Sequence, residues 1–428
     1  MLCIATIVSA NYLAYAKTLA DSVRMWEPDA SFRVLMVDRA TPRVTEAVEK
    51  LGLTVVFAED LGLEDFEELA FKYDIVELNT ALKPTFLKRL FADGFEQVWY
   101  MDPDIRLFGA VCSVKDALRE ASIALTPHSL VPVMDGLRPS DIDFLRTGSY
   151  NLGFIALRNS LEALKMLDWW ESRCLNYGFN DLGFGTFVDQ KWIDLVPAYF
   201  DGVAIVKDPG CNVAYWNLHE RQLSEENGAF NVNGKPLRFF HFSGVKAEFP
   251  ETLSRHQTRH KLVEGSTVAG LVKNYCGALM SNGHAEFSTI HYTFGAFDNG
   301  ELISASVRRA VTFLECTEGS PFSIGSSVRK ALDKIGVSTS EKTLRTRLTT
   351  LNFSQDAPEV IWVNRLIRLL VRFLGIGRTA RLLRYMTVVN REANLLRVVT
   401  GTKLDFSHRV NYSRYIGSLE SNRQGQGM

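Results

Sequence analysis

The sequence predicts an α/β fold with a mainly parallel sheet, helices on both faces of that sheet, and a mostly helical C-terminal extension. Three observations lead to this prediction. Short apolar runs alternate with amphipathic helical patterns over the first hundred residues, as in a parallel sheet with crossover helices. The 428 residues are 46% hydrophobic and 23% charged, which suits two or three soluble domains with ordinary cores. The last part of the chain is basic and has helical periodicity.

The first three strands are predicted from apolar runs at residues 4–8, 32–37 and 53–57. Helical patterns at residues 12–26 and 44–51 separate these runs. A further helix begins near Pro84, which suits a first helical turn, and ends at Gly94. The buried strand 97–101 follows and continues directly into Asp102-Pro103-Asp104. Ligands of open α/β sheets bind beyond the carboxyl ends of the strands, so we expect a site at this acidic segment.

The same alternation continues to a last apolar run at residues 238–244. It includes a strand at 154–157, a helix around Trp169 and an apolar segment at 187–192. We therefore predict three regions. They are a first domain over residues 1–255, an accessory region over 256–350, and a basic amphipathic helical region over 351–428.

Asp102 and Asp104 stand one residue apart at a strand end, so their carboxylates can meet at one point. Oxygen ligands of this kind suit Mg²⁺ or Mn²⁺ holding a diphosphate. Asp-Pro-Asp is also a favourable turn sequence, which is the plain structural alternative. His241 is the second candidate, because Ser243, Gly244 and Lys246 follow it at once. A histidine after two phenylalanines is alternatively a core residue.

Four segments in order resemble the motifs of the family 8 retaining glycosyltransferases, which have the Rossmann-like GT-A fold. Residues 98–104, Val-Trp-Tyr-Met-Asp-Pro-Asp, resemble the DxD segment, and residues 150–154, Tyr-Asn-Leu-Gly-Phe, resemble the N-x-G strand. Asp189-Gln190 resembles the aspartate-glutamine pair, and residues 241–246 resemble the HxxGxxK segment with one residue fewer before the lysine. The resemblance covers about residues 1–250, and residues 209–218 and 292–295 also resemble segments of bacterial relatives.

The resemblance implies a metal-dependent hexosyltransferase that uses a UDP-sugar, with Mn²⁺ or Mg²⁺ as cofactor. It implies roles for thirteen residues. The metal ligands would be Asp102, Asp104 and His241. Residues that hold the nucleotide, diphosphate or sugar would be Thr6, Val8, Ser9, Asn11, Lys83, Asp102, Asn151, Gly244 and Lys246. The catalytic pair would be Asp189, which contacts sugar hydroxyls, and Gln190, which lies at the anomeric face.

Other enzyme classes fit the sequence poorly. The turn after the first strand, residues 6–11, contains no glycine, which disfavours a dinucleotide-dependent dehydrogenase. The sequence contains neither a GxxxxGK[ST] phosphate loop nor a GxSxG elbow. Glycosidase carboxylates stand on separate elements, unlike this adjacent pair. Two hypotheses remain: a retaining transferase of bacterial surface polysaccharide synthesis with a glycan or lipid-linked acceptor, or a non-catalytic carbohydrate-binding or scaffolding relative.

The C-terminal region carries the remaining signal. Residues 301–428 contain 20 basic and 10 acidic residues, although the whole chain has a net charge of -1. Eight arginines lie among leucines over 358–399, in two amphipathic helices that would bind an anionic membrane surface or form a homo-oligomer. No nucleic-acid partner is expected. The six cysteines stand at least 35 residues apart, and no basic residue precedes the first apolar run. We expect a cytoplasmic protein. If the C-terminal helices bind lipid, the protein would be peripheral on the inner face of the plasma membrane.

Overall fold

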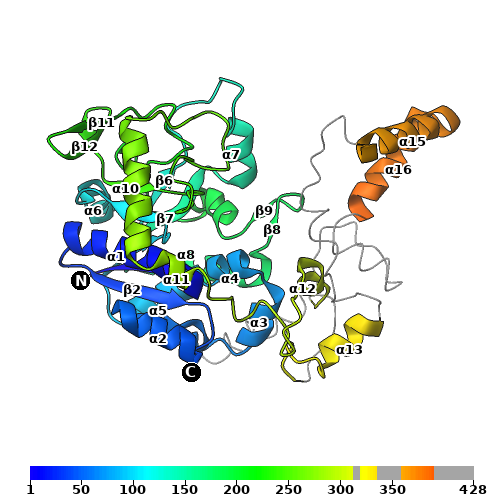
Figure 1. Ribbon diagram of the computed structural model, residues 1–428, viewed down its shortest axis with the longest axis horizontal. Helices are drawn as coiled ribbons and strands as arrows, with labels where there is room; N and C mark the ends of the chain where they lie inside the picture. Colours follow the sequence, from blue (N-terminus) through cyan, green and yellow to red (C-terminus); the bar gives the residue numbers. More distant parts are fainter. Residues whose placement is uncertain (312–318, 335–357, 390–428) are drawn as a thin grey trace. The chain divides into compact units, whose positions relative to one another are not determined.

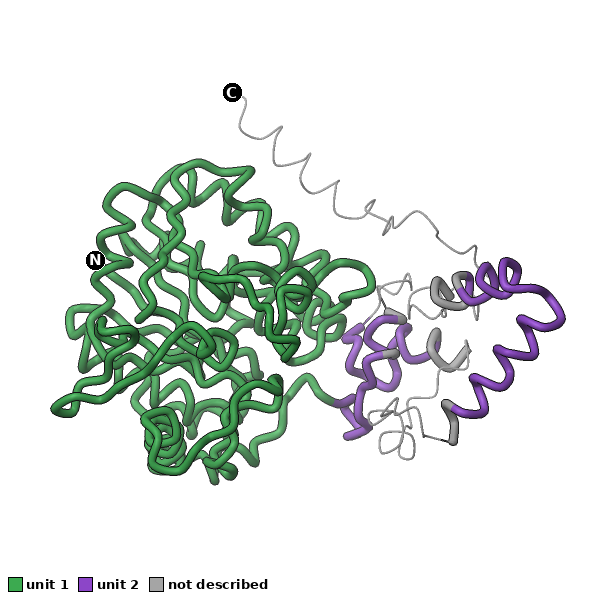
Figure 2. Tube along the Cα trace, turned by 90° about the horizontal axis from the view of Figure 1, so that it is seen from above, with its two compact units in different colours: residues 1–295 green, residues 296–428 purple. Residues whose placement is uncertain are grey.

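The computed structural model describes residues 1–311, 319–334 and 358–389 (Figure 1). The chain forms two compact units, Met1–Gly295 and Ala296–Met428 (Figure 2). The division after Gly295 places residues 256–295, the first part of the predicted accessory region, in the first unit.

A seven-stranded sheet forms the centre of the first unit, in the order β10-β6-β7-β4-β1-β2-β3. The β4–β7 and β6–β7 pairs are antiparallel, whereas the other four pairs are parallel. The predicted α/β class with a mainly parallel sheet is therefore confirmed. The seven strands are β1 (Leu2–Val8), β2 (Ser31–Met36), β3 (Val55–Phe57), β4 (Gln97–Met101), β6 (Ile123–Pro127), β7 (Tyr150–Arg158) and β10 (Val203–Ile205).

Helices cover both faces of this sheet, because its strands are apolar on both sides. Trp99 of β4 packs in one core with Leu19 of helix α1 and Leu118 of helix α6. The next residue of the strand, Tyr100, faces the other way, where the Lys83 ammonium of helix α5 lies 4.0 Å from the ring centroid. Helix α8 packs on α5 on that second face. The predicted coverage of both faces is thus confirmed.

The ends of several helices follow from local sequence. The Thr41 hydroxyl caps helix α2, Pro42 occupies its first turn, and Gly52 ends it with a φ of 61°. The helices of the first unit are α1 (Leu13–Trp26), α2 (Pro42–Leu51), α3 (Phe66–Lys72), α4 (Ile75–Ala81), α5 (Lys83–Ala92), α6 (Cys112–Glu120), α7 (Asp141–Thr147), α8 (Leu161–Tyr177), α9 (Val196–Tyr199), α10 (Thr267–Ser281) and α11 (His284–Phe287), with short 3₁₀ helices η1 (Ala10–Tyr12), η2 (Ala58–Leu61) and η3 (Gln190–Leu195).

Three small sheets complete the first unit. One of them brings together segments that are far apart in the chain, and another is a local hairpin. The short strand pairs are β5 (Ile105–Leu107) with β14 (Phe239–His241), and β8 (Asn180–Asp181) with β9 (Thr186–Phe187). The third sheet contains β11 (Leu223–Glu226), β12 (Ala229–Val232) and β13 (Lys235–Pro236).

The described part of the second unit is helical. Its helices are α12 (Ala305–Val311), α13 (Ser327–Lys334), α15 (Pro358–Leu374) and α16 (Ile376–Val389). The predicted helical C-terminal extension is therefore present. Arg391 and Arg397 of the predicted second basic helix lie outside the described residues. Among the described residues, no helix combines the length and the apolar content that crossing a lipid bilayer requires.

Candidate metal centre

The acidic segment forms the turn between β4 and β5. The Asp102 amide donates to the Gly153 carbonyl of β7 at 2.7 Å, and the Ile105 amide donates back to the Asp102 carbonyl at 3.0 Å. On the other side of the turn, the Phe242 amide donates to the Asp104 carbonyl at 2.8 Å. These backbone bonds fix both carboxylates at the carboxyl end of β4, where the sequence predicts a site.

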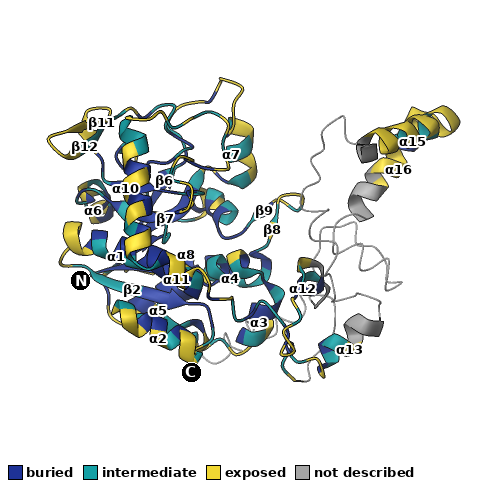
Figure 3. Cartoon of the chain, in the orientation of Figure 1, coloured by how far each residue is buried: buried dark blue, intermediate teal, exposed yellow. Residues whose placement is uncertain are grey.

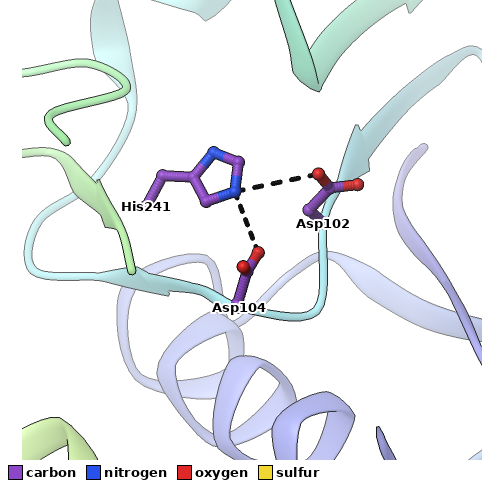
Figure 4. Close-up of side chains that lie close together, drawn as sticks. All are labelled: Asp102, Asp104 and His241. Atoms are coloured by element: carbon purple, nitrogen blue, oxygen red, sulfur yellow. Dashed lines mark ion pairs between the residues drawn. The ribbon is translucent and has the colours of Figure 1, made fainter. Parts of the chain in front are cut away.

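His241 reaches the same point from a segment 137 residues later than Asp104 in the chain. Strand β14 pairs antiparallel with β5, and the register sets His241 opposite Ile105. The His241 Nε2 atom lies 2.9 Å from Asp104 Oδ1 and 3.7 Å from Asp102 Oδ2 (Figure 4). The candidate ligand atoms of the three residues all lie within 4.8 Å of one another.

Asn151 determines which nitrogen of His241 faces the carboxylates. The Asn151 Oδ1 atom accepts hydrogen bonds from the Gly153 amide and from Asn212 Nδ2, each at 3.2 Å. The same oxygen lies 3.2 Å from His241 Nδ1. We therefore assign the proton to Nδ1, which leaves the lone pair of Nε2 directed toward Asp102 and Asp104. Metal-bound histidines are oriented by a second hydrogen bond in this way.

Gly153 makes the close approach of His241 possible. A Cβ atom at position 153 would lie 2.3 Å from His241 Cε1 and 2.7 Å from His241 Nδ1. These distances are far shorter than van der Waals contact, so any larger residue would displace the imidazole ring. The Asn-x-Gly pattern thus supplies both the oxygen that orients the ring and the space that the ring occupies.

The electrostatics also fit a cation. Desolvation raises the pKa of Asp102, with Lys83 and His241 opposing and Asp104 adding to the rise. Burial lowers the pKa of His241, but the Asp104 and Asp102 carboxylates together raise it by more, and the net shift is upward. Two carboxylates and one neutral imidazole nitrogen form a donor set that suits a divalent ion such as Mn²⁺ or Mg²⁺. The residues therefore fit the metal that the sequence predicts.

A buried ion pair lies beside these ligands. Lys83 Nζ lies 2.6 Å from Asp189 Oδ2, and both side chains are 2% exposed. Lys83 also donates to the Leu152 carbonyl at 2.8 Å. The Tyr100 hydroxyl, whose ring lies under the Lys83 ammonium, donates to Asp102 Oδ1 at 2.8 Å. The structure thus pairs two predicted donor-binding residues with each other, and Tyr100 connects that pair to a metal-ligand candidate.

Gln190 is similarly engaged with the protein. Its Oε1 atom accepts from the Leu152 amide at 3.0 Å, and its Nε2 atom donates to the Thr147 carbonyl at 2.9 Å. Asn151 Nδ2 lies 3.4 Å from the same Oε1 atom. Asn151 and Gln190 therefore lie together, and Gln190 connects β7 to the end of α7 through its two hydrogen bonds. Their predicted role toward a sugar stays a prediction.

The predicted uridine turn lies at the carboxyl end of β1, next to β4 in the sheet. Thr6 and Val8 are buried within the sheet, whereas the Ser9 hydroxyl donates to Asn11 Oδ1 at 2.6 Å beyond its end. Asn11 is the half-exposed member of this group. Of these four residues, only Asn11 has a partly exposed side chain, and the predicted nucleotide-binding role of the turn stays a prediction.

Gly244 and Lys246 follow β14 on the other side of the site. Gly244 has a φ of 77°, and a Cβ there would lie 2.5 Å from Ser254 Oγ, so the turn needs a glycine. The Lys246 side chain is exposed. The structure therefore keeps a cation at the surface just after the candidate metal centre.

Several side chains around the site were not predicted from the sequence. Tyr12 is 41% exposed and stacks on Tyr15 with ring centroids 4.6 Å apart. Desolvation and the nearby Asp104 charge raise the pKa of Tyr12, which places its hydroxyl close to the acidic turn. An aromatic residue directly after the predicted uridine turn was the signal available in the sequence.

His128 and Trp216 form the other missed group. The Trp216 ring packs edge-on against both His241 and His128, with centroids 5.1 Å and 5.4 Å apart. Asn151 Nδ2 lies 3.3 Å from His128 Nε2. Burial lowers the pKa of His128 to about 4, so this imidazole is neutral and accepts a hydrogen bond from Asn151. Trp216 lies in residues 209–218, which resemble a segment of bacterial relatives. No sequence motif connected His128 with the site.

The chain is similar in sequence to two proteins of Bacillus subtilis (strain 168). It is 28% identical to the uncharacterized protein YfnF over 246 residues, which are 56% of this chain and 80% of YfnF. It is also 28% identical to the uncharacterized protein YfnD over 245 residues, which are 56% of this chain and 76% of YfnD. No protein-family model matches the chain.

Similar solved structures are glycosyltransferases. One is galactosyltransferase LgtC in complex with donor and acceptor sugar analogs, with 16% identity, a TM-score of 0.41, and coverage of 64% of this chain and 95% of LgtC. Another is the glycosyltransferase GlyE of Streptococcus pneumoniae TIGR4, with 11% identity, a TM-score of 0.39, and coverage of 69% and 66%. A third is mouse xyloside xylosyltransferase 1 in its apo form, with 13% identity, a TM-score of 0.35, and coverage of 56% and 97%.

Membership of family 8 stays a prediction from the sequence motifs. Three segments, 102–104, 151–153 and 241, converge on one place at the carboxyl edge of the sheet and hold three candidate metal ligands there.

Proposed function

We propose that this protein is a metal-dependent GT-A glycosyltransferase that transfers a hexose from a UDP-sugar to a glycan or lipid-linked acceptor. The observation that carries the proposal is the convergence of Asp102, Asp104 and His241 within 4.8 Å at the carboxyl ends of the strands. Ligands of open α/β sheets bind in that place. A divalent ion held there would supply positive charge against the diphosphate of the departing nucleotide.

The surrounding residues would hold the two ends of the donor. Tyr12 presents an exposed ring beyond β1, where a nucleobase can stack, and Asn11 offers an amide beside it. On the other side, Asp189 uses part of its acceptor capacity on Lys83 and retains lone pairs for sugar hydroxyls. Asn151 and Gln190 line the same region. We assign the nucleotide to the β1 turn and the hexose to the Asn151 side.

The transfer itself needs one bond to break and one to form. The bond between the anomeric carbon and the diphosphate oxygen breaks, the acceptor oxygen bonds to that carbon, and the acceptor proton moves to the departing phosphate. Gln190 is the predicted residue at the anomeric face, and an amide is a poor nucleophile. We therefore favour a front-face route with retained configuration, in which the leaving phosphate guides the acceptor hydroxyl. The proposed setting is bacterial surface polysaccharide synthesis, on the basis of the sequence resemblance.

A panel of UDP-sugars tests the proposal through UDP release. The protein is stripped with EDTA and assayed before and after addition of Mn²⁺ or Mg²⁺. We expect metal-dependent release with at least one donor and its loss in Asp104→Asn, because that change removes a charge that offsets the cation. Asp116→Asn is the matched control, since Asp116 is 63% exposed on α6. Equal UDP release by Asp104→Asn and the wild type would contradict the metal assignment.

The second candidate function is a non-catalytic carbohydrate-binding relative with the same site. The hydrogen bonds of Gln190 and the Lys83–Asp189 ion pair favour this alternative, because these side chains already bind to other parts of the protein. This alternative predicts that Mn²⁺ and a UDP-sugar bind in calorimetry while no UDP is released with any acceptor.

A further inference from the structure

Helix α15 carries an apolar stripe that its neighbours leave exposed. Trp362, Leu366, Leu369 and Phe373 follow one another at spacings of four, three and four residues, so they lie along one side of the helix. Their exposed fractions are 65%, 43%, 51% and 80%. Figure 3 shows most of α15 as exposed.

The neighbouring helix α16 covers a different side of α15. The chain turns back at Gly375, which has a φ of 76°, and α16 packs against α15. The half-buried residues of α15 are Ile367, Leu370 and Val371, whose mean direction lies about 120° around the helix from the stripe. Packing against α16 therefore buries one apolar side of α15. The stripe is left exposed, because no described residue packs over it.

Arginines flank the stripe on its other side. Arg365, Arg368 and Arg372 lie at spacings of three and four residues and are exposed. Helix α16 adds exposed Arg378 and Arg381. The sequence contains no aspartate or glutamate between residues 360 and 391. The helix pair therefore combines the apolar stripe with a row of arginines beside it, and it has no acidic side chain between residues 360 and 391.

We propose that helices α15 and α16 bind the surface of an anionic lipid bilayer, with α15 lying in the membrane plane. The stripe would enter the boundary between headgroups and acyl chains, while the arginines would contact lipid phosphates. Trp362 and Phe373 mark the two ends of the stripe, about 16 Å apart along the axis. Aromatic side chains favour this interfacial depth.

Charge favours lipid over a second copy of the chain. Two α15 helices that met stripe to stripe would place six arginines, Arg365, Arg368 and Arg372 of each copy, beside one interface. The helix pair offers no acidic residue at positions 361–389 to offset them. An anionic bilayer supplies the opposite charge along the whole row. This proposal does not depend on sugar transfer, and its readout is lipid binding alone.

The experiment uses the full chain and sedimentation with vesicles. One vesicle is pure phosphatidylcholine, and the other contains about 30% phosphatidylglycerol to supply surface charge. We expect binding to the anionic vesicles, much weaker binding to the neutral ones, and a decline as salt rises from about 0.02 M to about 0.5 M because the Debye length shortens.

Two sets of variants separate the charge from the stripe. Replacing the three arginines of α15 with glutamine should weaken binding about 100-fold, at roughly five-fold for each arginine. Replacing Leu366, Leu369 and Phe373 with serine should leave only binding that about 0.5 M salt abolishes, because the salt-insensitive apolar part is lost. Matched controls on the first unit are the triple variants Arg24→Gln/Arg119→Gln/Lys261→Gln and Met25→Ser/Leu161→Ser/Val263→Ser, which change exposed residues.

All variants are compared by circular dichroism and light scattering, so that unfolding and changes in oligomeric state are seen directly. Failure of the folded wild-type chain to bind anionic vesicles at low salt would overturn the proposal. So would a serine variant that converts a wild-type dimer to a monomer without changing vesicle binding, because the stripe would then be a protein interface. Equal losses in the arginine variant and its first-unit control would also overturn it.

Discussion

The Lys83 ammonium lies 2.6 Å from a carboxylate oxygen of Asp189, and these two residues stand 106 positions apart in the chain. Both side chains are 2% exposed. Burial raises the pKa of Asp189, and the Lys83 charge opposes that rise. Each charge is therefore costly to bury by itself, and each offsets the cost of the other.

The first prediction follows from this pair. Lys83→Met should destabilise the protein by about 3–5 kcal/mol, because it leaves the Asp189 carboxylate buried without a partner. The double variant Lys83→Met/Asp189→Asn should recover a large part of that loss. Urea unfolding of the two single variants and the double variant measures the coupling.

The exposed pair of Arg89 and Asp93, which lie 49% and 40% exposed on and just after α5, provides the control. Arg89→Met should cost no more than about 0.5 kcal/mol. If Lys83→Met is as mild as Arg89→Met in urea but abolishes UDP-sugar binding, the lysine serves the donor rather than the fold.

The second prediction concerns Asn151, whose Oδ1 atom lies 3.2 Å from His241 Nδ1. Asn151→Ala removes the acceptor that orients the ring and should weaken Mn²⁺ binding about 10–100-fold. Asn151→Asp keeps an acceptor oxygen and should retain much tighter binding than the alanine variant. Calorimetric titration of the EDTA-stripped protein with Mn²⁺ measures both, and equal affinities for the two variants would contradict the orienting role.

The third prediction concerns Gly153. Gly153→Ala should abolish Mn²⁺ binding, because the new methyl group would stand 2.3 Å from His241 Cε1 and displace the imidazole. Gly270→Ala is the matched control on helix α10, where a Cβ meets nothing within 4 Å. It should leave metal binding unchanged and stabilise the protein by up to about 1 kcal/mol, since alanine favours helix. Retention of full Mn²⁺ affinity in Gly153→Ala would show that His241 is not a ligand.

The fourth prediction is a pH dependence that His128 causes. Burial lowers the pKa of His128 to about 4, compared with about 6.5 in an unfolded chain. Between those values the unfolded state binds a proton that the folded state does not. Stability therefore falls as the pH drops from about 6.5 toward 4, by up to about 3 kcal/mol, and is unaffected by this group above pH 6.5.

The variant His128→Gln isolates this contribution, because glutamine accepts the hydrogen bond from Asn151 but does not titrate. The stability difference between wild type and variant should change by about 1.4 kcal/mol per pH unit below pH 6.5. Urea unfolding at pH 7, 6 and 5 checks it. If the free energies of unfolding of the wild type and of His128→Gln change with pH in parallel, His128 does not cause the loss of stability at low pH.

Local sequence determined most of the sheet and part of the site. The predicted strand 97–101 coincides with strand β4 (Gln97–Met101), because the four consecutive apolar residues 98–101 next to a turn have few other structures available. Asp102 and Asp104 follow it directly, so their place at the carboxyl edge of the sheet is a consequence of chain connectivity. The pairing with His241 was predictable only through the resemblance, since its register depends on β14 meeting β5.

The tertiary structure alone decided how the predicted residues contact one another. The family resemblance implies that Lys83, Asp189 and Gln190 face the donor. In the structure, Lys83 of α5 pairs with Asp189 of the segment after β9, and Gln190 accepts a hydrogen bond from the backbone of β7. Neither spacing nor periodicity reports a contact between side chains so far apart in the chain. Those contacts arise because buried charges and amides must find partners inside the fold, and only the packed elements determine which partners are within reach.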